Sequence, residues 1–171
     1  MTRELLCLAN STKYDGRCVA GVDIETGEWV RPVSDREHGE LRANHWCTDR
    51  AYEPRPLDII SVPLRESTPE PHHPENWSLA EGDWRLRERG LTGQSTRVLK
   101  KTLHTGPDLF GDCKSSIDCD TVTTSPVESS LELVRPETTA LYRNKYHKSK
   151  SPRVEFQLSG ETYEMALTDP N

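Results

Sequence analysis

Three strand-like segments joined by short polar turns open the chain, and they constrain the fold more than any other feature. Residues 3–9 form a short apolar run, residues 17–24 continue the β-type composition, and residues 28–33 return after the turn ETGE. Gly27 reaches a positive φ easily, which favours a hairpin at that turn. Pro32 has no amide to donate to a neighbouring strand, so the third strand should end at a sheet edge or bulge. The opening segment therefore predicts an antiparallel sheet.

Apolar or alternating runs recur later in the chain and favour more strands. A continuous apolar run between turn signals fits a buried strand, and strict alternation fits a half-buried one. Further strands are predicted at residues 57–64, 131–134 and 154–158, with a hairpin turn at 159–161. A helix with one apolar face is predicted over residues 95–103. This inventory predicts an all-β fold with minor α content, which suits small barrels of Greek-key type.

The length of 171 residues suits one ordinary domain or two very small ones. Both ends offer a strand, a glycine turn and a strand with an aromatic residue, which fits two barrels of related build. We predict an N-terminal barrel (1–78), a basic and polar connecting region (79–126) and a second, incomplete unit (127–171); the family resemblance described below implies that both units are OB-like. Inside the first unit, residues 35–56 are predicted to form a long loop with one helical turn, and the proline-rich residues 66–77 a surface strap.

The cysteines do not predict a disulfide framework or a metal centre. Their number, five, is odd and their spacing is irregular, which fits free thiols in a reducing compartment. Cys7 and Cys18 lie in apolar strand patterns and are interpreted as core residues. The alternative is a zinc site built from His45, Cys47, Cys113 and Cys119. Because no Cys-x2-Cys pair occurs, we predict neither a metal nor another cofactor.

The sequence does not predict a membrane segment or an export signal. No run of about 18 apolar residues occurs, and the opening MTRELLCLAN lacks the length and the cleavage pattern of a secretory signal. We therefore expect a cytoplasmic protein without a membrane partner.

The charge of the chain is unevenly distributed. The net charge is −6, yet residues 85–104 and 142–153 are strongly basic. Such islands can bind phosphates locally, because counterion release depends on local contacts more than on total charge. The alternative is that they are ordinary solvated loops. Tyrosines and bases alternate in the second island, which predicts nucleic-acid contacts from Tyr142, Arg143, Lys145, Tyr146 and Lys148.

Trp29 and Arg31 lie on either side of Val30 in the third predicted strand. If Val30 faces the core, both neighbours point outward on one face, where a ring could stack on a base and a guanidinium could bind phosphate. The alternative is that the ring packs inward and Arg31 pairs with an acid such as Asp23.

Two further candidates, Lys13 and Arg17, flank the first loop between strands. Loops that a rigid scaffold positions often carry ligand contacts. The predicted nucleic-acid site therefore joins Lys13 and Arg17 to the Trp29 hairpin and to the second basic island.

Catalytic motifs are not evident. No histidine lies in a recognised nucleophile motif, and the sequence has neither a P-loop nor a G-x-G-x-x-G fingerprint. Acidic residues that could hold magnesium, as in a nuclease, lack the fixed spacing of a cation-binding loop; they are Asp108, Asp112, Asp118 and Asp120. We interpret them as a solvated acidic loop and assign no catalytic residue.

The opening stretch ELLCLANSTKYDGRCVAGVDIETGEWVRPVS resembles the bacterial dual OB-containing domain family. The segments LDIISVPL, HPENW and VEFQLSGETYEMALTDP are similar to that family in the expected order. The resemblance implies a pair of OB-like barrels and a role in nucleic-acid binding within defence systems against invading DNA. The chain departs from the family where further strands would follow Pro170. The second barrel is then built differently, completed by a partner chain or cut short.

Together these features predict a module that binds single-stranded or locally distorted nucleic acid and acts as a non-catalytic sensor or adaptor. An alternative is a protein-interaction subunit that docks onto an effector enzyme, with a partner protein or a second copy completing the second barrel. A metal-dependent nuclease is a third hypothesis.

Overall fold

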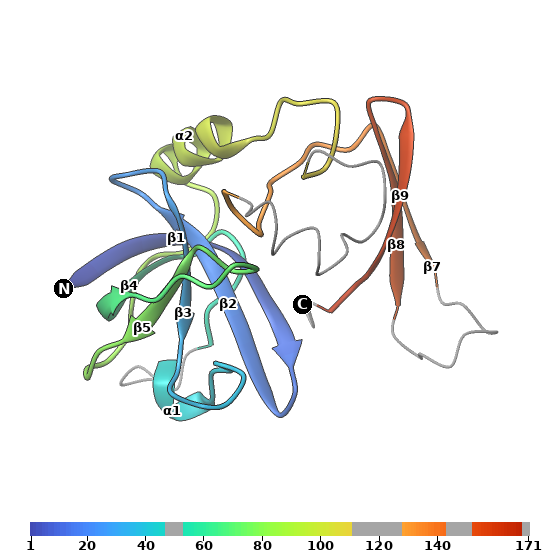
Figure 1. The fold of residues 1–171 in the computed structure, drawn as a ribbon. Coiled ribbons are helices and arrows are strands. Elements are labelled where there is room, and N and C mark those ends of the chain that lie inside the picture. Colours follow the sequence, from blue (N-terminus) through green and yellow to red (C-terminus); the bar gives the residue numbers. More distant parts are fainter. Residues whose placement is uncertain (47–52, 111–127, 143–151, 169–171) are drawn as a thin grey trace.

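The computed structural model describes residues 1–46, 53–110, 128–142 and 152–168, and it forms two sheets (Figure 1). The first sheet holds β1 (Thr2–Lys13), β2 (Gly16–Asp23), β3 (Trp29–Val33), β4 (Ile59–Ser67), β5 (Asn76–Leu79) and β6 (Arg85–Glu88). The second holds β7 (Thr138–Tyr142), β8 (Arg153–Leu158) and β9 (Glu161–Ala166). The helices are α1 (Ala43–Trp46) and α2 (Gly93–Thr102). The predicted fold class, mostly β with minor α, is confirmed.

The first sheet closes into a barrel because β1 pairs on both sides. Its strands follow the order β1-β2-β3-β5-β4, and β4 pairs again with β1. The first half of β1 pairs with β4 and most of its length with β2, with a bulge between Cys7 and Ala9. Such a bulge bends a strand and increases its twist, which helps one long strand serve both neighbours. β3 and β5 are parallel, and β6 extends the sheet beside β4. The result is a small closed barrel of five strands with one added strand.

The alternation of residues along β1 builds two cores. Leu5 and Cys7 belong to the core inside the barrel, together with Trp84 and Val30, and all four are at most 1% exposed. Leu6 points to the opposite face, as the period of two requires. There it forms a second core with Val22, Ile59 and Val98 of α2. The helix α2 therefore covers part of the barrel's outer surface.

The predicted helix is confirmed as α2. Thr92 caps its N-terminus, and the Thr92 hydroxyl and the Ser95 backbone and side chain form a capping box. Val98 and Leu99 pack on the second core, while Arg97, Lys100 and Lys101 are exposed. The helix thus presents a basic face to solvent.

The second sheet has a core of its own. Phe156, Leu158 and Tyr163 from β8 and β9 pack with Leu109 from the segment after α2. The Phe156 and Tyr163 rings stack with centroids 5.4 Å apart. The predicted hairpin at 159–161 is confirmed, with Ser159 and Gly160 both at positive φ. This core is therefore separate from the barrel cores, and it packs on an open three-stranded sheet.

Two sequence predictions of secondary structure are wrong. Residues 131–134 do not form a strand, because Leu133 makes an isolated bridge to Leu103 and no ladder follows. The proline-rich segment is more than a surface strap, since it ends in β5, which pairs with β3 and β4. Its buried residues are the polar Asn76 and Ser78, so β5 lacks the apolar alternation that would have identified it.

The strand β6 pairs with β4 and so continues the first sheet to Glu88, past the predicted end of the first unit at residue 78. The unit boundaries at 78 and 126 remain predictions. Hydrogen bonds join the barrel to the later segments: Thr12 N donates to Thr168 O at 2.9 Å, and His104 N to Leu133 O at 2.7 Å. In the described part of the chain, no helix has the length and apolar character needed to cross a membrane.

Candidate nucleic-acid interface

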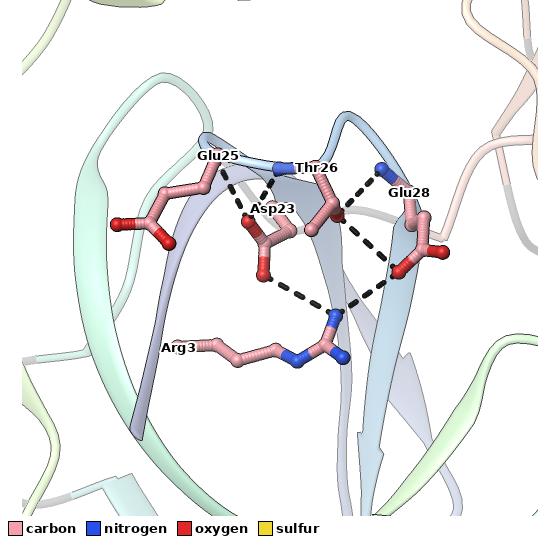
Figure 2. A network of polar contacts seen from close by, with 5 residues as sticks. All are labelled: Arg3, Asp23, Glu25, Thr26 and Glu28. Carbon is pink, nitrogen blue, oxygen red and sulfur yellow. Dashed lines mark hydrogen bonds and ion pairs between the residues drawn. The ribbon is translucent and has the colours of Figure 1, made fainter. Parts of the chain in front are cut away.

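The turn between β2 and β3 is fixed by a network of side chains (Figure 2). The Asp23 carboxylate accepts the backbone N–H groups of Glu25 and Thr26 at 2.9 and 3.1 Å. Arg3 bridges the Asp23 and Glu28 carboxylates at 3.3 and 3.2 Å, and Gly27 takes the predicted positive φ of 79°. The network determines where β3 begins, and therefore the position of Trp29.

Arg31 does not point outward beside Trp29, which corrects the orientation expected from the sequence. Its side chain is 7% exposed, its Nε donates to Asn76 Oδ1 at 2.7 Å, and the Glu75 carboxylate lies 3.7 Å away. The acid named in the alternative, Asp23, pairs with Arg3 instead. The reason is a change of strand partner: β3 pairs with β2 through Trp29 and Val30, and with β5 from Arg31 onward. The neighbouring β5 backbone brings Asn76 to Arg31.

Trp29 is half-buried and packs against the second core beneath α2. Its ring also lines a cleft of about 360 Å³ between the barrel and residues 128–133. Trp29 is therefore part of a cleft wall, and not a freely exposed stacking platform.

The β1–β2 turn carries the more accessible aromatic surface. Tyr14 is 67% exposed, adopts a φ of 51°, and stacks on His38 with ring centroids 4.1 Å apart. Lys13 ends β1 immediately before it. Tyr14 and His38 were not identified from the sequence, although Tyr14 directly follows the predicted Lys13. His38 is 24 residues further along the chain, so nothing in the sequence indicated that the two rings stack.

A cleft of about 680 Å³ adjoins this turn. Two arginines line it, Arg17 and Arg42. Arg17 pairs with Glu53 at 2.7 Å, and Arg42 forms an ion pair with Asp15. The Arg42–Asp15 pair is exposed on both sides, and exposed ion pairs contribute little stability, whereas the Arg17 side chain is half-buried.

The loop between β4 and β5 carries a histidine whose pKa is lowered. Burial lowers the pKa of His73 in that loop, and the positive charges of Arg31 and Lys13 lower it further. Lys13 is thus near enough to His73 to affect its ionisation, although the two are far apart in sequence. In OB folds the β1–β2 and β4–β5 loops commonly contact oligonucleotides.

The first basic island lies on two consecutive elements. Arg85 and Arg87 of β6 are exposed, and Arg87 pairs with Glu4 at 2.8 Å. Residues 89–92 then lead directly into α2 and its basic face. The α2 segment carries no acid, so the helix supplies a local positive surface in an acidic chain.

Of the candidate residues in the second basic island, the structure describes Tyr142; Arg153, at the end of the island, lies in β8 and forms an ion pair with Glu164. Tyr142 ends β7, where burial and a hydrogen bond to Glu164 raise its pKa. The other candidates of that island, Arg143, Lys145, Tyr146 and Lys148, lie outside the described residues, as do Cys47, Cys113, Cys119, Asp112, Asp118 and Asp120. The structure does not bring Tyr142 next to Lys13 or Arg17 in any interaction of the described segments.

Metal-binding clusters are not found among the residues that the structure describes: no group of three or more His, Cys, Asp and Glu side chains is arranged to hold an ion. Cys7 is buried in the barrel core as predicted, and Cys18 is half-buried. The chemistry of the described clefts is therefore that of rings, guanidinium groups and carboxylates.

The comparison with known families agrees with the barrel topology. The sequence model of the dual OB-containing domain matches residues 3–171. The chain belongs to the dual OB-containing domain family. No curated protein and no solved structure matches it. In this dual OB-containing domain, the N-terminal barrel has closed strand pairing with a parallel β3–β5 contact, and the second sheet is the three-stranded β7-β8-β9.

Proposed function

We propose that this dual OB-containing domain binds single-stranded or locally distorted nucleic acid at the β1–β2 turn and acts as a non-catalytic sensor or adaptor. The carrying observation is the stacked Tyr14–His38 pair, with Lys13, Arg17 and Arg42 beside it on a closed OB-type barrel. Single strands are bound by this combination of aromatic rings and positive charge in many OB folds. Its setting in a cytoplasmic bacterial defence system is proposed from the family resemblance alone.

In the proposed interface, aromatic rings contact bases and positively charged side chains contact phosphates. Tyr14 is the exposed ring on which a base would stack, and His38 supports its other face. Lys13, Arg17 and Arg42 would neutralise phosphates. Phosphate contacts position a strand and base contacts specify it.

The test is fluorescence anisotropy of labelled single-stranded DNA, single-stranded RNA and duplex DNA at two salt concentrations. We expect single strands to bind, and Tyr14→Ala to weaken binding about 5- to 150-fold, which corresponds to about 1–3 kcal/mol for one stacked base. Leu141→Ala, which removes a 68% exposed side chain from β7, is the matched control and should leave binding unchanged. Lys13→Ala should reduce the salt slope by about one unit.

Two results would contradict the proposal, one for strand binding itself and one for the position of the interface. If no single strand binds at low salt, the proposed function is rejected for this chain. If strands bind and Tyr14→Ala behaves like Leu141→Ala, the interface lies elsewhere on the protein.

A second candidate function is that of a protein-interaction subunit, and the strand β7 favours it. In the described residues β7 pairs with β8 alone, and its side chains from Thr138 to Leu141 are exposed. An exposed strand edge can accept a strand from a partner chain. Light scattering of the purified protein and of the Leu141→Lys variant tests this candidate. If the wild-type protein is an oligomer and Leu141→Lys makes it a monomer, a second copy of the chain is the partner. If both proteins are monomers, a second copy is excluded and the partner would have to be a different protein.

A further inference from the structure

The helix α2 carries basic residues that lie outside the proposed interface at the β1–β2 turn. An α-helix turns by about 100° per residue, so its exposed and its covered residues separate into two faces. Val98 is buried and Leu99 is half-buried against the second core. The exposed residues of the helix share the opposite face, which is the basic face of α2; they are Gly93, Gln94, Arg97, Lys100 and Lys101.

The three bases of this face form one continuous stripe. Arg97 lies three residues before Lys100 and four before Lys101. Residues at these spacings are neighbours on a helix surface, with Cβ atoms about 5–6 Å apart. Within the residues that the structure describes, none of the three side chains forms an ion pair with a carboxylate. By contrast, the two arginines of the β1–β2 cleft are each paired with one. The stripe therefore keeps its positive charge available to a ligand.

Strand β6 adds a base on the same side of the barrel. Arg87 Nε donates to Glu4 Oε1 at 2.8 Å. Glu4 is two residues before Leu6 on β1, and alternate residues of a strand point to the same face of a sheet. Leu6 packs in the second core together with Val98 of α2. The first basic island therefore presents bases from both its strand and its helix on the face of the barrel that α2 covers.

The composition of the basic face argues against a membrane or a protein as its ligand. A helix that binds a membrane surface inserts its apolar residues among the lipids, whereas Val98 and Leu99 of α2 are packed on the barrel. The centres of protein interfaces are enriched in aromatic residues and depleted in lysine. The basic face has two lysines and no aromatic residue. Positive charge is thus the property that this face offers to a ligand.

We propose that the basic face of α2 binds the phosphate backbone of duplex nucleic acid, at a site that shares no residue with the β1–β2 turn. Without an aromatic ring the face does not stack a base, so its affinity comes from phosphate contacts. Duplex DNA has one negative charge per about 1.7 Å of its axis, and each neutralised phosphate releases more counterion than in a single strand. A stripe of bases without rings therefore favours a duplex. This inference goes beyond the proposed function, because neither Tyr14 nor a single strand takes part in it.

The experiment measures the anisotropy of a labelled blunt duplex of about 20 base pairs between about 50 and 200 mM salt. A blunt duplex has no single-stranded end for the β1–β2 turn to bind. The test variant removes the stripe as a whole, with Arg97→Gln, Lys100→Gln and Lys101→Gln together. Glutamine has nearly the helix propensity of lysine and arginine, so α2 should remain folded.

A matched control separates the position of the charges from their number. The control variant carries Arg55→Gln, Arg65→Gln and Arg135→Gln, which remove the same charge from exposed positions outside α2. We expect the wild-type protein to bind the duplex, and the α2 variant to reduce the salt slope by about three units, one for each lost phosphate contact. The control variant should keep the slope of the wild type. Tyr14→Ala should leave duplex binding unchanged.

Three outcomes would overturn the inference. If the duplex does not bind the wild-type protein at low salt, the basic face has no such ligand. If the control variant loses as much affinity as the α2 variant, net charge is responsible and the stripe is not a site. If poly-glutamate displaces the duplex at equal charge concentration, the face fits an acidic protein as well as a nucleic acid, and the assignment to a phosphate backbone is wrong.

The same measurements distinguish this inference from the proposed function. If the duplex binds through α2 and no single strand binds, the inference stands and the proposed function fails. If single strands bind through Tyr14 and the duplex does not bind, the proposed function stands and the inference fails.

Discussion

The two sheets of this protein differ in how they end. The barrel closes because β1 pairs with both β2 and β4, and among the described residues its core holds ten buried side chains that include Trp84 and Leu64. The described strands β7-β8-β9 form an open sheet, and the core of this sheet has four buried side chains in the described ranges, one of which, Leu109, comes from outside the sheet. Three strands with one apolar face are near the lower limit of independent stability. The difference teaches that the barrel can determine its own shape, whereas the second sheet depends on its neighbours.

The largest expected effect is that of emptying the barrel core. Trp84→Ala removes a side chain that is 1% exposed and should lower the free energy of unfolding by about 3–5 kcal/mol. Chemical denaturation measures this loss. The matched variant Phe156→Ala should increase amide exchange in β7–β9 and leave β1–β5 protected, because it lies in the separate core. Equal loss of protection in both sheets would show that they unfold as one unit.

The next effect concerns Glu75, which connects Arg31 of the barrel to Ser130 in the segment before β7. Its buried carboxylate lies 3.7 Å from Arg31 Nε and accepts hydrogen bonds from the Ser130 hydroxyl and backbone N–H at 2.6 and 3.1 Å. Glu75→Ala should cost about 3 kcal/mol, since it leaves the Arg31 charge buried without its carboxylate. Ser130→Ala should cost about 1–2 kcal/mol, because it removes the hydrogen bonds of the Ser130 hydroxyl with Glu75 and with His73 Nδ1 while the buried charges stay paired. Thermal unfolding compares them, and equal losses would contradict the importance of the Arg31 charge.

A smaller pair of effects compares one glycine from each sheet. A Cβ atom on Gly21 of β2 would lie 2.3 Å from the Leu6 carbonyl oxygen, so Gly21→Ala forces the β1–β2 backbones apart. We expect a loss of about 2–3 kcal/mol. At Gly160 a Cβ atom meets nothing within 4 Å, and Gly160→Ala should cost only about 1 kcal/mol for its φ of 84°. Urea denaturation tests the order, and the reverse order would contradict it.

The smallest effect is a pH dependence at the loop between β4 and β5. Burial and the charges of Arg31 and Lys13 hold the pKa of His73 below its ordinary value, so the folded protein binds a proton there less readily than the unfolded chain. Stability should therefore be complete above about pH 6.5 and fall as the pH drops below it. Burial also lowers the pKa of His45, which adds to the same trend.

Histidine variants test whether His73 and His45 cause this pH dependence of stability. His73→Gln should flatten the fall in melting temperature between about pH 6.5 and 5 in part, and His73→Gln with His45→Gln should flatten it further. An unchanged slope in the double variant would contradict the assignment.

Much of the barrel could be predicted from the sequence because its signals are local. The apolar runs of β1, β2 and β4, the glycine turn at Gly27 and the amphipathic α2 all depend on neighbours in the chain. Strand β5 could not be predicted, since its buried side chains are Asn76 and Ser78, whose burial depends on partners from distant segments. The same reason explains the wrong strand at 131–134, where apolar residues meet another part of the chain and no strand.

The candidate site divides in the same way. Lys13, Arg17 and Trp29 could be named from the sequence because residue type and loop position point to them. Their partners could not: Tyr14 meets His38, and Trp29 shares its cleft with Phe110 and residues 128–133. Arg31 shows the limit most clearly, because alternation along β3 predicts an exposed side chain and the parallel pairing with β5 buries it.

The sequence by itself determined the class of fold, the hairpins and the basic helix, since these follow from periodicity, turn residues and charge within short windows. Only the tertiary structure decided which strands close the barrel, which acid pairs with Arg31 and which rings form a cleft. Those outcomes depend on contacts between residues far apart in the chain. Their free energy comes from burial and pairing that exist only when the distant segments meet.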